Sequence, residues 1–183
     1  TTDFSAAVQS MVDNGCTSAV LVSYAADGGM IIDEMASLGW SGQVYGGDGI
    51  AEEGLAADTT SSVDGVIATK PAAGSMGTVG YVFQGLCAQS ADCAGGIYTA
   101  EAFDSVVVMA LSAFAQMASP GATLSQVIMA TGQGVDGASG MISFLANGDV
   151  PGAGYCVGDF TEDVDGNVAF TCNRSWDPAN GMS

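Results

Sequence analysis

Hydrophobic positions at helical and strand spacings divide the first 71 residues into alternating helices and strands. Apolar residues at i, i+3, i+4, i+7 and i+8 predict a helix over 4–14. A continuous apolar run predicts a parallel strand over 18–23 that is covered on both faces. A helix over 28–38 and strands over 43–46 and 63–71 follow. This alternation is typical of a doubly wound α/β sheet.

The pattern becomes mainly helical after Pro71. Helices are predicted over 78–88, 99–117 and 123–131. The second of these is apolar nearly all round, which predicts that it lies at the centre of a core. Its most apolar part, residues 106–117, is too short to cross a membrane, and the chain has no run of about 18 or more apolar residues. This run is therefore interpreted as a buried helix.

Three glycine-rich stretches are interpreted as turns or connectors. Residues 132–137, GQGVDG, satisfy the G-x-G-x-x-G pattern but follow a helical run instead of a strand, which favours a glycine-rich connector over a dinucleotide loop. Residues 162–168, EDVDGNV, begin like a calcium loop but lack a glutamate at the twelfth position. A hairpin turn at Asp165-Gly166 fits them better, and Asn147-Gly148 predicts a second hairpin.

The stretch VYGGDGIAEEG, residues 44–54, places one carboxylate among glycines at the end of a predicted strand. Asp48 follows the strand over 43–46, and Tyr24 follows the strand over 18–23. Parallel strands end at one edge of a sheet, and open α/β sheets bind ligands at that edge. There an ionised carboxylate would pair with a ligand ammonium, and the flanking glycines would let the ligand approach the backbone. From these residues alone, a simple turn explains Asp48 equally well.

Charge and missing residue types exclude several functions. The chain has 20 acidic residues against Lys70 and Arg174, a net charge of −18 that repels nucleic acid and anionic lipid. It has no histidine, which excludes Ser-His and Cys-His nucleophile pairs and histidine zinc sites. It also lacks a G-x-S-x-G elbow and a GK[ST] loop. We expect no enzyme, cofactor or metal site. The catalytic alternative is a hydrolase with carboxylate metal ligands, which predicts tight divalent-metal binding.

The cysteines fall into two candidate pairs and a remainder. Cys87 and Cys93 flank a polar loop with no nearby histidine, which favours a loop-closing disulfide over a metal site. Cys156 and Cys172 lie on two strand-like runs joined by a turn, where a cross-strand disulfide is plausible. Cys16 is left over and is predicted to be a buried thiol. Two pairs indicate an oxidising compartment.

Six stretches, in this order, resemble one protein family. They are TDFSAAVQSMVDNG, VLVSYAADGGMIIDEMASLG, VYGGDG, GVIATKP, YTAEAFDSVVVMAL and GMISFLANGDVPGAGYCVGDF. Together they resemble the C-terminal half of a type I periplasmic solute-binding protein of the branched-chain amino-acid (Leu/Ile/Val) group, which serves ABC importers. The resemblance covers nearly the whole chain and is weakest over 72–97 and after residue 172.

The resemblance implies an α/β fold of the periplasmic-binding-protein type I, with two doubly wound parallel-sheet lobes joined by crossover hinge strands. Residues 1–70 would belong to lobe 2, residues 71–153 would form the C-terminal part of lobe 1, and residues 154–183 would return to lobe 2 as its closing strands. Lys70 and Pro71 would lie near a hinge. The first strands of each lobe would lie outside this C-terminal fragment, leaving one sheet edge unpaired, and self-association is one way to cover it.

The resemblance also implies the site and its use. Tyr24 resembles the lobe 2 aromatic at the ligand, and Asp48 resembles the carboxylate that holds the ligand's α-ammonium, where the best-known members have glutamate. Tyr98 resembles a lobe 1 aromatic of the same pocket. The implied function is a periplasmic or extracellular amino-acid-binding component of an ABC importer, with permease subunits as partners and a lipid anchor upstream as an option. The alternative is a receptor or regulator domain of the same fold that senses amides or amino acids without transport.

Overall fold

The chain forms two compact units. The computed structural model describes residues 3–72, 77–90, 93, 98–152, 154–177 and 180–183. Unit 1 consists of residues 1–71 and 154–183, and unit 2 consists of residues 72–153. The chain therefore passes from unit 1 to unit 2 directly after Pro71 and returns at Gly154.

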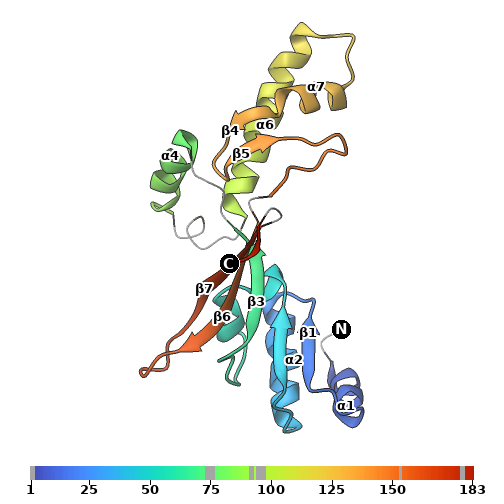
Figure 1. Cartoon of the computed structure of the whole chain (residues 1–183), viewed down its shortest axis with the longest axis vertical. Coiled ribbons are helices and arrows are strands. Elements are labelled where there is room, and N and C mark those ends of the chain that lie inside the picture. Colours follow the sequence, from blue (N-terminus) through green and yellow to red (C-terminus); the bar gives the residue numbers. More distant parts are fainter. Residues whose placement is uncertain (1–2, 73–76, 91–92, 94–97, 153, 178–179) are drawn as a thin grey trace. The chain divides into compact units, whose positions relative to one another are not determined.

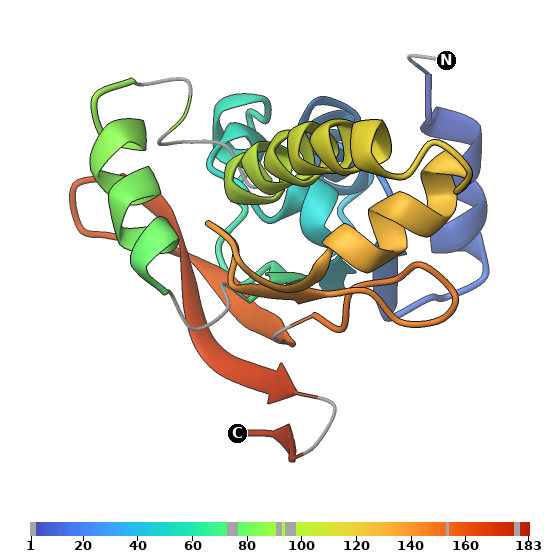
Figure 2. The same ribbon diagram turned by 90° about the horizontal axis from the view of Figure 1, so that it is seen from above.

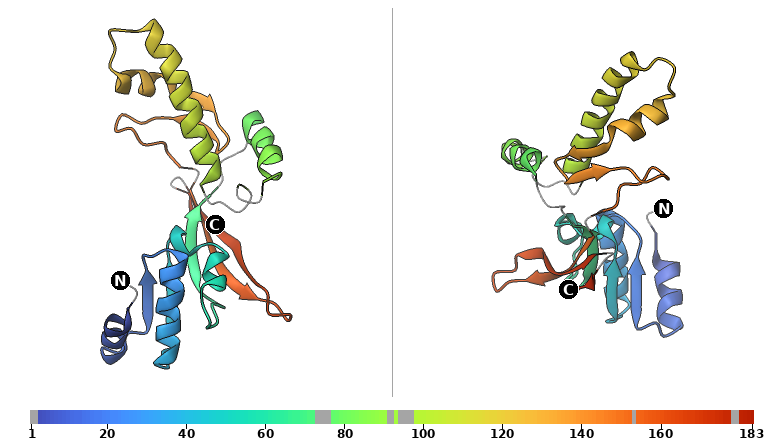
Figure 3. Two further views of the ribbon diagram at one scale, coloured as in Figure 1. Left: turned by 180° about the vertical axis from the view of Figure 1, so that it is seen from behind. Right: turned by 45° about the horizontal axis from the view of Figure 1, so that its top comes forward.

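Unit 1 is a six-stranded sheet with helices (Figures 1 and 3). Its strand order is β1-β2-β3-β6-β7-β8, in which β1, β2 and β3 are parallel and the remaining neighbours are antiparallel. The long β6–β7 hairpin twists away from the parallel strands. In chain order the elements are α1 (Ser5–Asp13), β1 (Ser18–Leu21), α2 (Ala25–Ser37), β2 (Gln43–Gly46), the 3-10 helix η1 (Asp48–Ile50), α3 (Gly54–Ala57), β3 (Ile67–Pro71), β6 (Tyr155–Glu162), β7 (Val168–Asp177) and β8 (Gly181–Met182).

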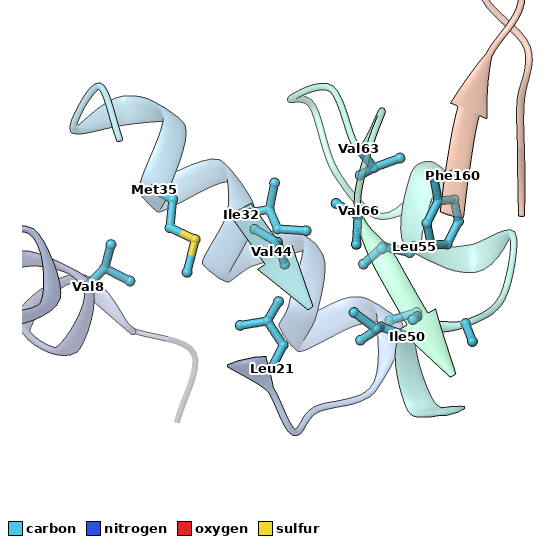
Figure 4. Packing of buried hydrophobic residues seen from close by; sticks show 13 residues of the cluster. Val8, Leu21, Ile32, Met35, Val44, Ile50, Leu55, Val63, Val66 and Phe160 are labelled. Atoms are coloured by element: carbon cyan, nitrogen blue, oxygen red, sulfur yellow. The ribbon is translucent and has the colours of Figure 1, made fainter. Parts of the chain in front are cut away.

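The core of unit 1 lies between the helices and one face of the sheet (Figure 4). Leu21 and Val44 point into it from β1 and β2, and Ile32 and Met35 meet them from α2. Phe160 on β6 is fully buried and packs against Phe170 of β7, with the rings tilted by 58° and their centroids 5.2 Å apart. Apolar residues at helical spacing in α2 and at alternate positions in the strands account for this layer.

The opposite face of β1 and β2 is uncovered within the described residues, so the prediction of a strand buried on both faces is wrong. Val20 and Val22 are 71% and 96% exposed, and Tyr45, the register partner of Val20, is 41% exposed. The cause is the direction of winding. Right-handed crossovers that add β2 and then β3 on the same side of β1 place their helices on one face only. Helices would cover the other face only if the sheet continued beyond β1, its edge strand, through connections that add strands on the opposite side of β1.

Unit 2 packs two helices on a short β-ribbon. Its described helices and strands are α4 (Thr78–Cys87), α6 (Thr99–Ala118), α7 (Leu124–Thr131), β4 (Gln133–Asp136) and β5 (Met141–Ser143). Figure 2 shows α6 and α7 on the same side of the antiparallel β4–β5 ribbon. A capping box between Thr123 and Gln126 begins α7. Because β4 lies within residues 132–137, the interpretation of that stretch as a connector is wrong.

The helix α6 is exposed over most of its surface, so the prediction that it lies at the centre of a core is also wrong for the described residues. Only Asp104, Val108 and Ser112 are buried, whereas Phe114 and Met117 are 70% and 73% exposed. The reason is that the described part of unit 2 has only a two-stranded ribbon and two short helices to cover it, α7 and α4, the latter meeting α6 where the Phe83 and Phe103 ring centroids lie 5.1 Å apart. The helix α6 is long and apolar enough to cross a membrane. Core helices of soluble proteins meet the same two criteria of length and composition.

A buried carboxylate sets the hairpin of unit 2. Asp104 accepts hydrogen bonds from the Ala138 amide at 2.6 Å and from the Ser139 amide and hydroxyl at 2.8 and 2.7 Å. These bonds hold the turn between β4 and β5, and β5 pairs with β4 in the antiparallel direction. Asn147-Gly148 does form a turn, closed by the bond from the Leu145 amide to the Asp149 carbonyl at 2.7 Å, but no strand flanks it within residues 144–152. The hairpin predicted there is therefore wrong.

The hairpin predicted at Asp165-Gly166 is confirmed. It joins β6 to β7, and the Asp163 carboxylate accepts the amides of Asp165 and Asn167 at 2.8 and 2.9 Å. The side-chain and backbone hydrogen bonds of Asn167, followed by the Asp165 amide, lower the pKa of Asp163. Gly166 takes the left-handed conformation that the turn needs, with φ of +83°.

Four cysteines form two disulfides. Cys87 is bonded to Cys93, and Cys156 is bonded to Cys172 across β6 and β7 with a Cα–Cα distance of 5.6 Å. Both bonds join the residues that the spacing paired. Cys16 is exposed, which corrects the prediction of a buried thiol. It lies in the turn that ends α1, where its amide bonds to a carbonyl of that helix, so its side chain does not enter the sheet.

Candidate functional site

Two loops of unit 1 meet at the carboxyl edge of the parallel strands. β1 and β2 end side by side, with Leu21 opposite Gly46. Tyr24 follows β1 as the residue before α2 and is 79% exposed, and Asp48 follows β2 as the first residue of η1. The predicted meeting of the two loops at one edge is thus confirmed, because both strands run in the same direction. The roles of the two side chains stay predictions.

Ile50 anchors the loop that carries Asp48. It is fully buried in the same hydrophobic cluster as Leu21, and Figure 4 shows it beside Leu21 in that cluster. A Cβ on Gly46 would overlap the Ile50 side chain, and one on Gly28 would lie 3.0 Å from its Cγ2 and 3.3 Å from Leu55 Cδ1. The glycines of β2 and α2 therefore make the space into which Ile50 inserts, and the insertion fixes the height of η1 above the sheet.

The two glycines beside Asp48 differ in their surroundings. A Cβ on Gly47 would have no heavy atom within 4 Å, so space is open there. A Cβ on Gly49 would overlap the Ser23 carbonyl oxygen and lie 3.4 Å from Cδ1 of Tyr24. The expectation that both glycines make room for a ligand is therefore wrong at Gly49, whose space serves the packing of the two loops. The sequence singled out Gly49 for ligand approach but not its contact with Ser23, because their proximity depends on the pairing of β1 with β2.

Acidic groups outnumber basic groups around this edge. Asp27 lies in the first turn of α2, and Asp48 begins η1. The Glu52 carboxylate is near the start of α2 as well, because a Cβ on Gly54 would lie 3.7 Å from Glu52 Oε1 and 3.5 Å from the Ala25 side chain. Of the two basic residues, Arg174 lies on β7 opposite Val157. The Lys70 ammonium lies over the Phe170 ring, 5.1 Å from its centroid. This balance of charge favours a ligand group that is positive.

A second carboxylate fastens the segment that leads from α3 toward β3. Asp33 on α2 accepts hydrogen bonds from the Thr59 hydroxyl at 2.7 Å and from the amides of Thr60 and Ser61 at 3.0 and 2.8 Å. Burial raises the pKa of Asp33, but the bonds from Ser61, Thr59 and Thr60 outweigh burial and hold this pKa well below its usual range. The backbone that carries the chain from the candidate site to β3 is thereby tied to α2.

The remaining predicted residues lie at the boundary between the units and in unit 2. Lys70 and Pro71 are the last residues of β3 and pair with Cys156 and Tyr155 of β6, directly before the chain enters unit 2. Tyr98 belongs to unit 2, where it precedes α6 and is 46% exposed. The hinge role of the first two and the ligand contact of Tyr98 stay predictions.

The described residues contain no group of three or more histidine, cysteine, aspartate or glutamate side chains placed to hold a metal ion. At the edge of unit 1, Asp48 brings a carboxylate and Tyr24 an exposed phenol, beside the backbone groups of the two loops. Groups of this kind are suited to a small polar ligand.

Comparison with known proteins identifies the fold. No family model and no curated protein matches the sequence. Among solved structures, a leucine-binding protein, LivK, from Thermotoga maritima is similar with a TM-score of 0.75 and 20% identity over 97% of this chain and 49% of its own. LivJ from Streptococcus pneumoniae, in complex with isoleucine, has a TM-score of 0.62 and 19% identity over 93% and 49%. A solute-binding protein from R. palustris, in complex with 4-hydroxybenzoate, has a TM-score of 0.69 and 14% identity over 97% and 50%.

The chain therefore has the type I periplasmic-binding-protein fold, as the resemblance implied. It is similar to a type 1 periplasmic binding protein from Bordetella pertussis as well, with a TM-score of 0.71 and 14% identity. The chain spans about half the length of these proteins.

Proposed function

We propose that this chain supplies one wall of an amino-acid-binding site in an extracytoplasmic solute-binding protein that serves an ABC importer. Asp48 pairs with the ligand's ammonium group, and Tyr24 shapes the pocket beside it. The observation that carries the proposal is the meeting of the two loops at the carboxyl edge of parallel strands, the edge at which open α/β sheets bind ligands.

Charge supports an amine-bearing ligand over a simple anion. The chain has a net charge of −18, and acidic groups predominate at the starts of α2 and η1. A charge-assisted hydrogen bond from an ammonium to a carboxylate contributes about 1.5–3 kcal/mol. A ligand whose only charged group is a carboxylate would instead be repelled by the acidic groups of this wall. The structural neighbours LivK and LivJ are amino-acid-binding proteins, in keeping with this class of ligand.

The opposite wall comes from the second lobe, to which Tyr98 belongs in this proposal. The residues of unit 2 correspond to the returning part of lobe 1, and Lys70 and Pro71 to one hinge crossing. Two disulfides fit an extracytoplasmic location. In use, the lobes close on the ligand about the hinge, and the closed form engages the permease.

The test compares two isosteric charge changes in the protein expressed from its complete reading frame. Calorimetric titration with L-leucine, and then with the other branched-chain amino acids, measures the affinity of the wild type, of Asp48→Asn and of the control Asp165→Asn. Asp165 is an exposed acid in the distant β6–β7 turn. We expect Asp48→Asn to weaken binding by about tenfold or more, which corresponds to about 1.4 kcal/mol, and the control to bind as the wild type does. Equal affinity in all three would remove Asp48 from the site.

A further inference from the structure

Close packing of the two edge loops leaves space for glycine alone at position 49. A Cβ on Gly49 would lie well inside 3.0 Å of the Ser23 carbonyl oxygen, a separation that real Cβ atoms essentially never show. The obstructing atom belongs to the backbone between β1 and α2, so it cannot turn aside as a flexible side chain would. Any larger residue at this position must move the η1 loop away from the residues that follow β1.

The neighbouring residue prevents the loop from moving as a free segment. Ile50 is fully buried against Gly46 and Gly28, and the Ala51 amide donates to the Asp48 carbonyl at 3.0 Å. Asp48 is therefore held between an anchor in the core and a close contact with the β1 loop. Because Ile50 stays in the core, the displacement that a side chain at position 49 demands falls on the residues before it, which include Asp48.

We propose that Gly49 is a positioning residue of the ligand site. Its missing side chain sets the separation between the Asp48 carboxylate and the Tyr24 ring, and with it the affinity for the ligand's ammonium. This inference rests on the proposed function, and it assigns to Gly49 a role distinct from ligand contact. A Cβ at this position would lie 3.4 Å from Tyr24 Cδ1, an ordinary van der Waals distance, so the obstruction comes from the Ser23 carbonyl oxygen.

Gly47 provides the matched control. It flanks Asp48 on the other side, a Cβ there would meet nothing within 4 Å, and its φ of −88° suits any residue. The φ of Gly49 is not positive either. Alanine at either position thus adds the same atoms and has the same effect on unfolded-state entropy, and the two positions differ in the contacts that a Cβ at 49 would make with Ser23 and Tyr24.

The experiment uses Gly49→Ala and Gly47→Ala in the protein expressed from its complete reading frame, with two readouts. Calorimetric titration with L-leucine separates the dissociation constant from the stoichiometry, so that a misfolded fraction lowers only the stoichiometry. Hydrogen–deuterium exchange of the peptide that spans residues 44–54 reports on the loop without any ligand. We expect Gly49→Ala to raise the dissociation constant by about tenfold or more at unchanged stoichiometry and to speed exchange of the Ile50 and Ala51 amides. Gly47→Ala is the control for the loop itself, and exchange of these amides in it should stay within about twofold of the wild type.

The outcomes separate this inference from the proposed function. If Asp48→Asn weakens binding but Gly49→Ala binds and exchanges as the wild type does, the positioning role is overturned while the proposed function stands. If the wild type binds no amino acid, the proposed function fails, and the exchange readout alone decides whether Gly49 holds the loop. If Gly49→Ala lowers only the stoichiometry and leaves the dissociation constant unchanged, Gly49 serves folding and the positioning role is overturned.

Discussion

Removal of the Cys156–Cys172 disulfide should lower the free energy of unfolding of unit 1 by about 3 kcal/mol. The bond joins residues 16 apart in sequence, and loop-closure entropy gives about 3 kcal/mol for a loop of about this length. It also spans the irregularity in the β6–β7 ladder between Val157 and Gly158, where pairing alone specifies the register weakly. The change is the double substitution Cys156→Ala with Cys172→Ala, made so that no new thiol remains at either position.

The two tryptophans make the assay specific to one unit. Trp40 and Trp176 are the only tryptophans in the chain, and both belong to unit 1. Urea unfolding followed by tryptophan fluorescence should show the midpoint of unit 1 falling by about 2 M, for a slope of about 1.5 kcal/mol/M. The matched control removes Cys87–Cys93, which closes a separation of 6 residues in unit 2 and should leave the tryptophan transition in place.

Two results would contradict this prediction. A tryptophan transition that moves by less than about 1 kcal/mol when Cys156 and Cys172 are replaced would show that the hairpin does not depend on the bond. A transition that moves equally in both double variants would show that the two units do not unfold separately.

Three further predictions concern carboxylates and charge. Asp104→Asn should raise hydrogen exchange of the Ala138 and Ser139 amides by about tenfold, since an amide cannot accept all three bonds that the carboxylate accepts; unchanged exchange would contradict this. The pKa of Asp33 is held below its usual range by its hydrogen bonds, so its stabilising effect is complete above about pH 4 and is lost as pH falls further. Urea midpoints measured from pH 5 to pH 2.5 should therefore fall less steeply in Asp33→Asn than in the wild type, and equal slopes would count against the hydrogen-bond account. With a net charge of −18, the urea midpoint should rise as NaCl is increased from about 0.05 to about 1 M, and a midpoint that stays constant or falls would exclude self-repulsion as a destabilising factor.

The sequence predicted those features that depend on local patterns. The alternation of helices and strands up to Pro71 is present, because each element carries its own apolar periodicity. The turn at Asp165-Gly166 is present, because aspartate and glycine favour that geometry wherever they occur. The meeting of the Tyr24 and Asp48 loops followed from two parallel strands alone.

The errors concern burial and contacts between distant segments. Val20 and Val22 have the composition of a buried strand, but their burial depends on a helix wound in the opposite direction, which no pattern within the strand reveals. The apolar surface of α6 predicts that another segment packs on it, but the sequence of α6 does not indicate which segment this is. The need for glycine at position 49 arises from the Ser23 carbonyl, 26 residues earlier in the chain, and a Gly-Asp-Gly stretch reads as an ordinary turn without that contact.

In the proposed function, the carboxyl edge of unit 1 holds the ammonium group of an amino acid. The most direct test is a calorimetric titration of the protein, expressed from its complete reading frame, with L-leucine and with 4-methylpentanoate, which differs from leucine only in lacking the amine. We expect that leucine binds and that the des-amino compound binds at least about tenfold more weakly, with the difference abolished in Asp48→Asn. Equal affinity for the two compounds in the wild type would contradict it.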